Sequence, residues 1–345
     1  MQVFKTSLGF ILLVFLLCVS ILLGISLGTL HIPLADTYTF FLEKLSHQEP
    51  SNKIFSGVIW QIRMPRVLLG VLLGAGLALC GVVMQAVVQN PLAEPFLLGI
   101  SAGGYLGATV FIILGGSFIG GIASANGLAV TAFLGALVAS IGVIGLASYR
   151  SKMTTTKLIL SGTIMNALCT STANFIMVFA GDDSTVSRVT FWTMSSLAST
   201  RWENLTLPAI AVILGGFYFI TQSRTLNLLL QGEETAITLG LRVSAYRNTY
   251  LIVVALLTGI LVSTCGIIGF VGLIIPHISR AMVGPNHHKL LPVSMLVGAI
   301  FLVNMDMLAR TLIANVELPI GIFTSMIGAP FFAWILVRKN YQFKE

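Results

Sequence analysis

The sequence predicts an all-α membrane protein, a polytopic bundle of ten transmembrane helices. Hydrophobic residues make up 56% of the 345 residues and only 9% are charged, with a mean hydropathy of +0.95. So few charges cannot cover a water-soluble surface. Apolar runs recur at about the 20 residues that cross a bilayer as a helix, and the alternating segments typical of a membrane barrel are absent. We expect one transmembrane domain over residues 1–345.

The ten expected spans follow one another along the chain. The first apolar run exceeds the length of a signal-peptide core and no small-residue cleavage site follows it, so we expect it to remain as a span. Between spans, the long connections Ile32–Gln61 and Gly181–Glu203 predict an outer cap and a short interfacial helix that carries tryptophans. The spans are Leu8–Leu30, Met64–Val88, Phe96–Leu114, Gly127–Ala147, Leu158–Ala180, Leu205–Thr221, Thr249–Cys265, Ile267–Val283, Leu290–Ala309 and Pro319–Val337.

The distribution of positive charge predicts the orientation. An even number of spans places both termini on one side. If that side is the cytoplasm, 12 of the 19 lysines and arginines lie inside, as the positive-inside tendency requires. The net charge of +7 is then a sign of topology and not of nucleic-acid binding.

Internal patterns add two expectations about packing. Cys80–Val83 is followed by Pro91 at the same offset at which Cys265–Ile268 is followed by Pro276, in spans of opposite direction. This echo predicts an inverted-repeat-like arrangement. Small residues four apart predict close approach of helices, at Gly70 and Gly74, Gly103 and Gly107, and Gly116 and Gly120.

Several kinds of chemistry are not indicated. The phosphate-binding pattern G-x-x-x-x-G-K-[ST], the zinc pattern H-E-x-x-H and the nucleophile elbow G-x-S-x-G are absent. The four cysteines are far apart and lack metal spacing. We therefore expect no enzyme activity, no metal site and no cofactor in this chain. Asp306 with Arg310 one turn later predicts a helical ion pair in preference to a proton relay.

The most informative segment is QGEETAITLGLRVSAYR, Gln231–Arg247. It is polar and helix-prone, and long apolar runs enclose it. Gly232 breaks the preceding run, and Glu233 and Glu234 suit the first turn of a helix. A narrow apolar face is formed by residues at three- to four-residue spacing, namely Ala236, Leu239, Gly240 and Val243. This pattern predicts a short cytoplasmic helix that another protein can move; the alternative is a solvated connecting loop.

Two further constellations lie at the ends of the spans. Arg63, Arg66 and Arg310 break the positive-inside tendency, and Pro65 suits the first turn of a helix. Together they predict an outer basic rim for a carboxylate-bearing partner, with lipid snorkelling or loop pairing as alternatives. At the inner mouth, small polar groups and a leucine indicate a constriction, which ordinary loop chemistry explains equally well. They lie in Gln89–Pro95 and Thr154–Lys157.

Four long segments resemble the FecCD family, the membrane permeases of bacterial ABC importers for iron–siderophore complexes, haem and cobalamin. They occur in order at Arg63–Gly103, Gln231–Val243, Gly269–Pro292 and Glu317–Ile335. The resemblance implies ten helices and a second permease, either a copy or a paralogue. It also implies two cytoplasmic ATPases that bind ATP and Mg²⁺, and an external substrate-binding protein. The expected cargo is an iron chelate, a ferric siderophore or haem; alternatives are cobalamin or, from another class, an ion-coupled secondary transporter.

The resemblance also implies roles for individual residues. Those of the coupling segment, residues 225–247, would sit in a cleft of the ATPase: Gly232, Glu233, Glu234, Ala236, Leu239 and Gly240. Those that would meet acidic groups of the binding protein are Arg63, Arg66 and Arg310. Those that would narrow the inner mouth are Asn90, Leu92, Thr155 and Thr156.

Overall fold

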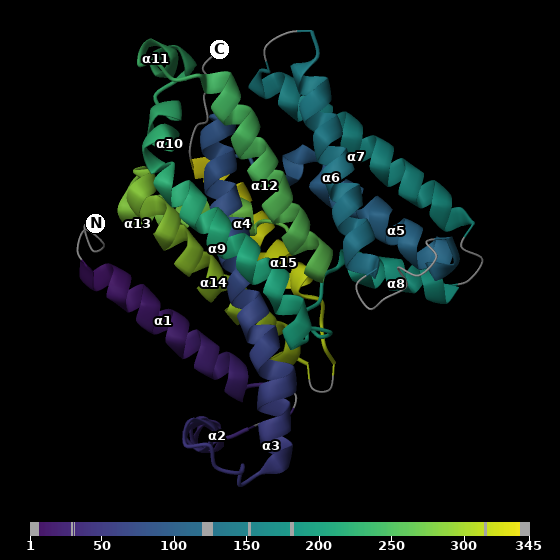
Figure 1. Ribbon diagram of the computed structural model, residues 1–345, viewed down its shortest axis with the longest axis vertical. Helices are drawn as coiled ribbons and strands as arrows, with labels where there is room; N and C mark the ends of the chain where they lie inside the picture. The colour runs from purple at the N-terminus through teal and green to yellow at the C-terminus, as the bar shows by residue number, and fades with distance from the viewer. Residues whose placement is uncertain are drawn as a thin grey trace.

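A computed structural model describes residues 7–28, 30, 32–118, 127–150, 153–179, 183–313 and 316–338. Within these ranges the regular structure is helical, with no β-strand (Figure 1). The elements are α1 (Ser7–Ser26), α2 (Leu34–Leu45), α3 (Lys53–Gly57), the π-helical η1 (Val58–Arg63), α4 (Met64–Val88), the 3-10 turn η2 (Pro95–Leu98), α5 (Ile100–Phe118), α6 (Gly127–Ser148), α7 (Thr155–Val178), α8 (Asp183–Thr193), η3 (Trp202–Leu205), α9 (Thr206–Thr221), α10 (Ser223–Leu229), α11 (Glu233–Thr238), α12 (Val243–Cys265), α13 (Val271–Val283), α14 (His287–Thr311) and α15 (Ile320–Arg338).

The apolar helices confirm a multi-pass membrane bundle. Six helical segments of the described chain are long and apolar enough to cross a bilayer: Leu8–Ser26, Lys53–Val88, Gly127–Ser148, Trp202–Thr221, Val243–Cys265 and His287–Thr311. Shorter apolar helices cover Ile100–Ile113, Val271–Val283 and Ile320–Ile335. Ten membrane-crossing helices therefore stay a prediction, as does the inverted-repeat-like arrangement.

Two expected spans begin later than the sequence indicated. The third was placed from Phe96, but residues 95–98 form a 3-10 turn and Gly99 adopts φ +74°, so α5 begins at Ile100. The eighth was placed from Ile267, but Phe270 adopts φ +68° at the N-cap and α13 begins at Val271. At about 1.5 Å per residue, the 13-residue α13 reaches roughly 20 Å, short of a hydrocarbon core of about 30 Å.

Helix α4 lies at the centre of the bundle. Every residue from Leu73 to Val88 is buried, and α9, α12, α13 and α14 surround it (Figure 1). Glycines permit this packing: a Cβ on Gly74 would collide with the backbone of Gly298 in α14, and one on Gly81 with the backbone of Gly272 in α13. Close approach is thus confirmed at Gly74, and at Gly103 and Gly107, where an added Cβ would collide with the backbone of α6. At Gly70 an added Cβ would make only ordinary contacts, 3.5 Å or more from its neighbours. Gly120 lies outside the described residues.

Helices α5, α6 and α7 pack on one another as a second group beside α12, and α8 lies across one end of them (Figure 1). The short helix expected within Gly181–Glu203 is present as α8. Because α11 and α2 lie at opposite ends of the bundle (Figure 1), we call these the α11 end and the α2 end.

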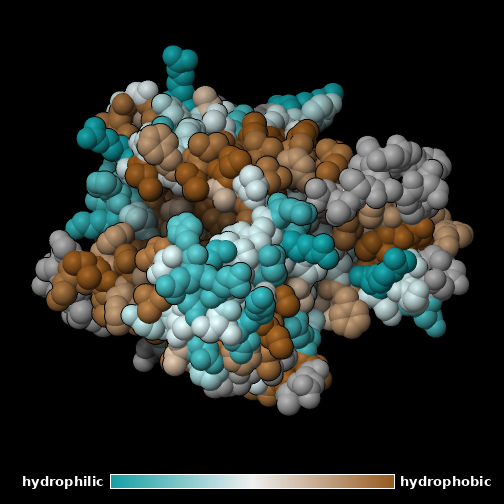
Figure 2. Space-filling view, turned by 60° about the horizontal axis from the view of Figure 1, so that its bottom comes forward, coloured by the Kyte–Doolittle hydropathy of each residue, from teal (hydrophilic) through white to brown (hydrophobic). Residues whose placement is uncertain are grey.

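The connection Ile32–Gln61 forms a compact cap at the α2 end. The rings of Trp60 and Trp202 have centroids 4.8 Å apart, and the indole nitrogen of Trp202 donates to the Trp60 carbonyl at 2.8 Å. Lys44 Nζ lies 4.2 Å from the Trp60 ring centre, a cation–π contact. Figure 2, with this end turned toward the viewer, shows hydrophilic residues gathered near the centre of the face and apolar residues along its flanks.

Candidate functional site

Helix α11 is a six-residue helix delimited by two glycines. Gly232 precedes it at φ +107° and Gly240 follows it at φ +85°, and a Cβ at either position would meet no atom within 4 Å. Backbone conformation, and not lack of space, therefore requires glycine here. The Gly240 N–H donates to the Ile237 carbonyl at 2.8 Å and the Leu241 N–H to the Ala236 carbonyl at 2.9 Å. These two hydrogen bonds form a Schellman motif, which terminates the helix.

One side of α11 is anchored and the other is free within this chain. Ala236 is fully buried in the main core, whereas Ile237 and Leu239 are 50% and 60% exposed. Glu234 is exposed as well. Leu239 and Gly240 therefore do not share the packed face that their spacing predicted, because the helix ends at Thr238 and the motif at Gly240 redirects the chain. The result is an exposed apolar pair beside an acidic group.

The turn that follows α4 lies at the same end. Gln89 ends the helix at φ +53°, and Asn90 Oδ1 accepts the Leu92 N–H at 2.9 Å, which closes a side-chain-supported turn. A ring nitrogen of His277 in α13 lies 2.9 Å from the Pro91 carbonyl oxygen. The expected turn is thus present, with Asn90 and Leu92 half-buried.

The start of α7 meets this turn. Thr155 donates its hydroxyl to the Val88 carbonyl at 2.9 Å, so the structure brings it to the end of α4, two residues before Asn90 in the sequence. Thr156 is exposed. Glu94, in the same connection, is half-buried, and burial raises the pKa of its carboxyl to about 7. Its proton occupancy therefore changes near neutral pH.

The arginines at the α2 end do not form an exposed basic rim. Arg63, Arg66 and Arg310 are 4%, 5% and 3% exposed. Arg63 donates to the carbonyls of Ile25, at 2.8 Å, of Ser26 and of Leu30, and so satisfies the free acceptors at the end of α1. The prediction of an exposed rim is wrong because carbonyl groups and acidic side chains of this chain surround the guanidinium groups.

Acidic partners hold the other two arginines. Arg66 Nε lies 2.9 Å from Asp306 Oδ1, and its Nη1 lies 3.1 Å from Glu317 Oε1. Arg310 Nε lies 3.4 Å from Asp306 Oδ2, which confirms the helical ion pair expected from their spacing, and Arg310 also donates to the Gly24 carbonyl. This network joins α1, α4, α14 and the segment before α15. Sequence reasoning missed the part of Glu317, which had no periodic signal to mark it.

Helix α7 carries a polar face that the sequence analysis did not single out. Thr163, Thr170 and Asn174 are exposed and Asn166 is half-buried, at intervals of three, four and four residues. That spacing places them on one side of a helix. The buried side of α7 adjoins this face and is mostly small, with Leu158, Ser161, Gly162, Cys169 and Ala173. The regular spacing of the polar residues was a usable signal.

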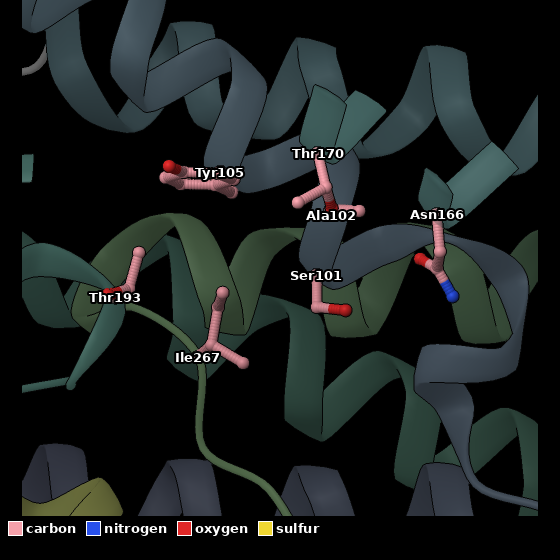
Figure 3. A pocket seen from close by; sticks show the side chains of 7 residues that line it. All are labelled: Ser101, Ala102, Tyr105, Asn166, Thr170, Thr193 and Ile267. Carbon is pink, nitrogen blue, oxygen red and sulfur yellow. The ribbon is translucent and has the colours of Figure 1, made fainter. Parts of the chain in front are cut away.

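An open cavity of about 290 Å³ lies between this face, α5 and the ends of α8 and α12 (Figure 3). Asn166 Oδ1 is buried there without a hydrogen-bond partner, and the Tyr105 hydroxyl donates to Asn174 Oδ1 at 2.8 Å. None of the described residues that line the cavity is charged. Its wall is neutral and hydrogen-bonding, formed by Ser101, Ala102, Tyr105, Asn166, Thr170, Thr193 and Ile267. Among the described residues, no group of three or more His, Cys, Asp or Glu could hold a metal ion.

A helical membrane bundle with a small exposed helix at one end and a neutral cavity among its helices points to the class of membrane transport proteins. Comparison with known proteins identifies which kind. The model of the FecCD transport family matches residues 15–338, and the chain belongs to this family. It is an ABC importer permease, a transport subunit of a multi-pass membrane assembly.

Individual relatives of this chain are permeases of the same kind. The chain is 38% identical over 285 residues to the cobalamin import system permease protein BtuC of Halobacterium salinarum, covering 83% of this chain and 74% of that protein. It is 37% identical over 285 residues to the hemin transport system permease protein HmuU of Yersinia pestis, covering 82% and 84%. A solved structure assigned as a metal-chelate type ABC transporter, in an inward-facing conformation, superimposes with a TM-score of 0.80 at 31% identity, covering 95% and 98%.

Proposed function

We propose that this chain is one of two permease subunits of an ATP-driven importer that moves an iron chelate, a ferric siderophore or haem, across the cytoplasmic membrane by alternating access. The observation that carries the proposal is α11, which is anchored through Ala236 and presents exposed Ile237 and Leu239 beside Glu234. An apolar pair with an acidic neighbour at the end of a membrane bundle fits a cleft of a soluble partner.

In this proposal the α11 end and both termini face the cytoplasm, and two ATPase subunits that bind ATP and Mg²⁺ contact the coupling segment of each permease. The residues in contact are Gly232, Glu233, Glu234, Ala236, Leu239 and Gly240. A shift from mostly closed to mostly open needs roughly 5.5 kcal/mol of differential binding. The nucleotide-bound ATPases supply this energy, and the turn at Asn90 and Leu92, with Thr155 and Thr156, narrows or opens the inner mouth.

An external binding protein docks at the α2 end and delivers the cargo. Arg66 meets Glu317 across 3.1 Å, and the Glu317 side chain is 40% exposed. An acidic group of the binding protein therefore reaches Arg66 by exchanging with Glu317, while Arg63 and Arg310 stay bonded inside the chain. Docking through Arg66 thus requires a rearrangement of the α2 end.

The cavity wall supports a cargo whose metal is already enclosed. A bare or partly coordinated cation needs carboxylate, thiolate or imidazole ligands, whereas the lining offers hydroxyl groups and one side-chain amide, that of Asn166. A chelate with its own ligand atoms around the metal presents neutral hydrogen-bonding edges that such a wall can contact in passing. The same wall suits cobalamin, which is the second candidate cargo because a relative at 38% identity is named for cobalamin import.

Reconstitution tests the proposal. The chain is placed in liposomes with its second permease, both ATPases and the binding protein, and uptake of a radioiron siderophore, radioiron haem and radiolabelled cobalamin is measured with and without ATP. We expect ATP-dependent accumulation of an iron chelate. Accumulation of cobalamin and of no iron chelate would show that the cargo is cobalamin. Uphill uptake by the isolated chain under an ion gradient would refute the importer and favour a secondary transporter.

A further inference from the structure

Arg247, in the second turn of α12, joins two segments that are distant in sequence. Its Nη2 lies 3.0 Å from Glu233 Oε2 in α11, and its Nη1 donates to the Met153 carbonyl at 2.7 Å. The Arg247 side chain is only 12% exposed. The planar guanidinium group serves both acceptors at once because its N–H groups diverge in a fixed fork. One side chain therefore ties α11 to the residues just before α7.

Two more bonds continue from there to the inner turn and back. Thr155, two residues after Met153, donates to the Val88 carbonyl at 2.9 Å. Gln89, the next residue of α4, donates its side-chain amide to the Leu229 carbonyl at 2.7 Å. Leu229 ends α10, four residues before Glu233. The four bonds and the short stretches of chain between them thus form a closed ring around the inner end of α4.

The ring connects the partner-facing helix with the turn that Asn90 and Leu92 form. Beyond the ring, α4 is buried from Leu73 to Val88 and surrounded by other helices. We therefore expect movement imposed on α11 to displace the ends of α4 and α7 before the rest of α4. Charge-assisted bonds of a largely buried guanidinium are stronger than bonds at an exposed surface. Arg247 is the member of the ring that bonds to two others.

We propose that Arg247 is the positioning residue that transmits movement of α11 to the inner turn, through Met153 and Thr155 to the end of α4. This inference rests on the proposed function, since it requires that an ATPase displaces α11. In this inference the bonds of Arg247 to Glu233 and Met153 make α11 and the start of α7 move as one unit.

The test uses the complete reconstituted importer and measures cargo uptake and ATP hydrolysis in the same liposomes. Arg247→Gln removes the ion pair. We expect it to lower uptake at least tenfold while ATP hydrolysis stays within twofold of the wild type. Arg224→Gln is the matched control, because Arg224 is an exposed arginine of α10 near the same end. It should leave both rates unchanged.

A second variant guards against simple misfolding. Thr155→Val preserves the shape of the side chain, removes the bond to Val88, and lies on the far side of the ring from α11. We expect the same separation of uptake from ATP hydrolysis. Spin labels at Thr156→Cys and Thr238→Cys, with Cys18→Ala in each labelled chain, should keep one distance with and without nucleotide in the wild type. In Arg247→Gln that distance should change with nucleotide.

Each outcome decides a different question. Uptake per ATP within twofold of the wild type in both Arg247→Gln and Thr155→Val would overturn the role of Arg247, even where the wild type transports normally. Loss of ATP hydrolysis in both variants would also overturn it, because the ring would then govern assembly and not transmission. Absence of ATP-driven uptake by the wild type would instead defeat the proposed function.

Discussion

Asp306 provides a quantitative test of the buried charge network at the α2 end. Its two oxygens contact Arg66 at 2.9 Å and Arg310 at 3.4 Å, and all three side chains are at most 5% exposed. Asp306→Asn keeps the shape but removes the charge. Arg66 retains Glu317, whereas Arg310, among the described residues, keeps only the carbonyl of Gly24 as a hydrogen-bond acceptor. Removing one partner of a buried ion pair costs about 3 to 5 kcal/mol.

The free energy of unfolding is measured by denaturant titration in mixed micelles, with tryptophan fluorescence as the signal. We expect Asp306→Asn to lower it by about 3 kcal/mol or more. The control is Glu49→Gln, which breaks the exposed pair between Glu49 and Lys53 at 3.9 Å. Such surface pairs contribute at most about 1 kcal/mol. If Asp306→Asn and Glu49→Gln lowered stability equally, the network would not hold the α2 end together and the reasoning would fail.

The remaining predictions concern the α11 end and the cavity. Gly240→Ala places a Cβ at φ +85° and should destabilise α11 by about 1 to 2 kcal/mol. Amide hydrogen exchange of residues 233–241 should become faster and uptake should fall. Unchanged exchange would contradict the role of that backbone conformation. Glu94 binds its proton more tightly when folded, since its pKa is raised from 4.5 to about 7, so wild-type stability should fall as pH rises through that window. Glu94→Gln should therefore have a larger free energy of unfolding than the wild type at pH 8, by at most about 3 kcal/mol, and the same free energy near pH 4. A difference that stays constant across pH would refute this. Asn166→Leu should lower uptake several-fold while membrane insertion and ATP hydrolysis stay normal. Uptake equal to that of the wild type would show that the cavity is not part of the transport pathway.

The sequence predicted the features that local periodicity controls. Apolar length indicated the bundle, the glycine-bounded acidic segment indicated α11, and the four-residue spacing of Asp306 and Arg310 indicated their ion pair. Each depends on residues within one or two helical turns, where side-chain spacing decides the outcome.

Long-range partners were not predictable in the same way. Arg63 bonds to carbonyls 33 to 38 residues earlier, and Arg66 to a carboxylate 251 residues later. No local pattern encodes such pairings, so three cations near the end of spans were placed on an exposed rim when they are interior. The polar face of α7 was overlooked for another reason: spans were recognised by hydropathy, which averages over the faces of a helix and hides a polar stripe.

In the proposed function, force enters this bundle through α11. The most direct measurement is photo-cross-linking in cells, with a photoreactive amino acid at Leu239, 60% exposed, or at Leu45, 81% exposed at the opposite end. A cross-link from position 239 to the ATPase subunit, and none from position 45, is the result that the account predicts. A cross-link to the ATPase from position 45 with none from position 239 would contradict it.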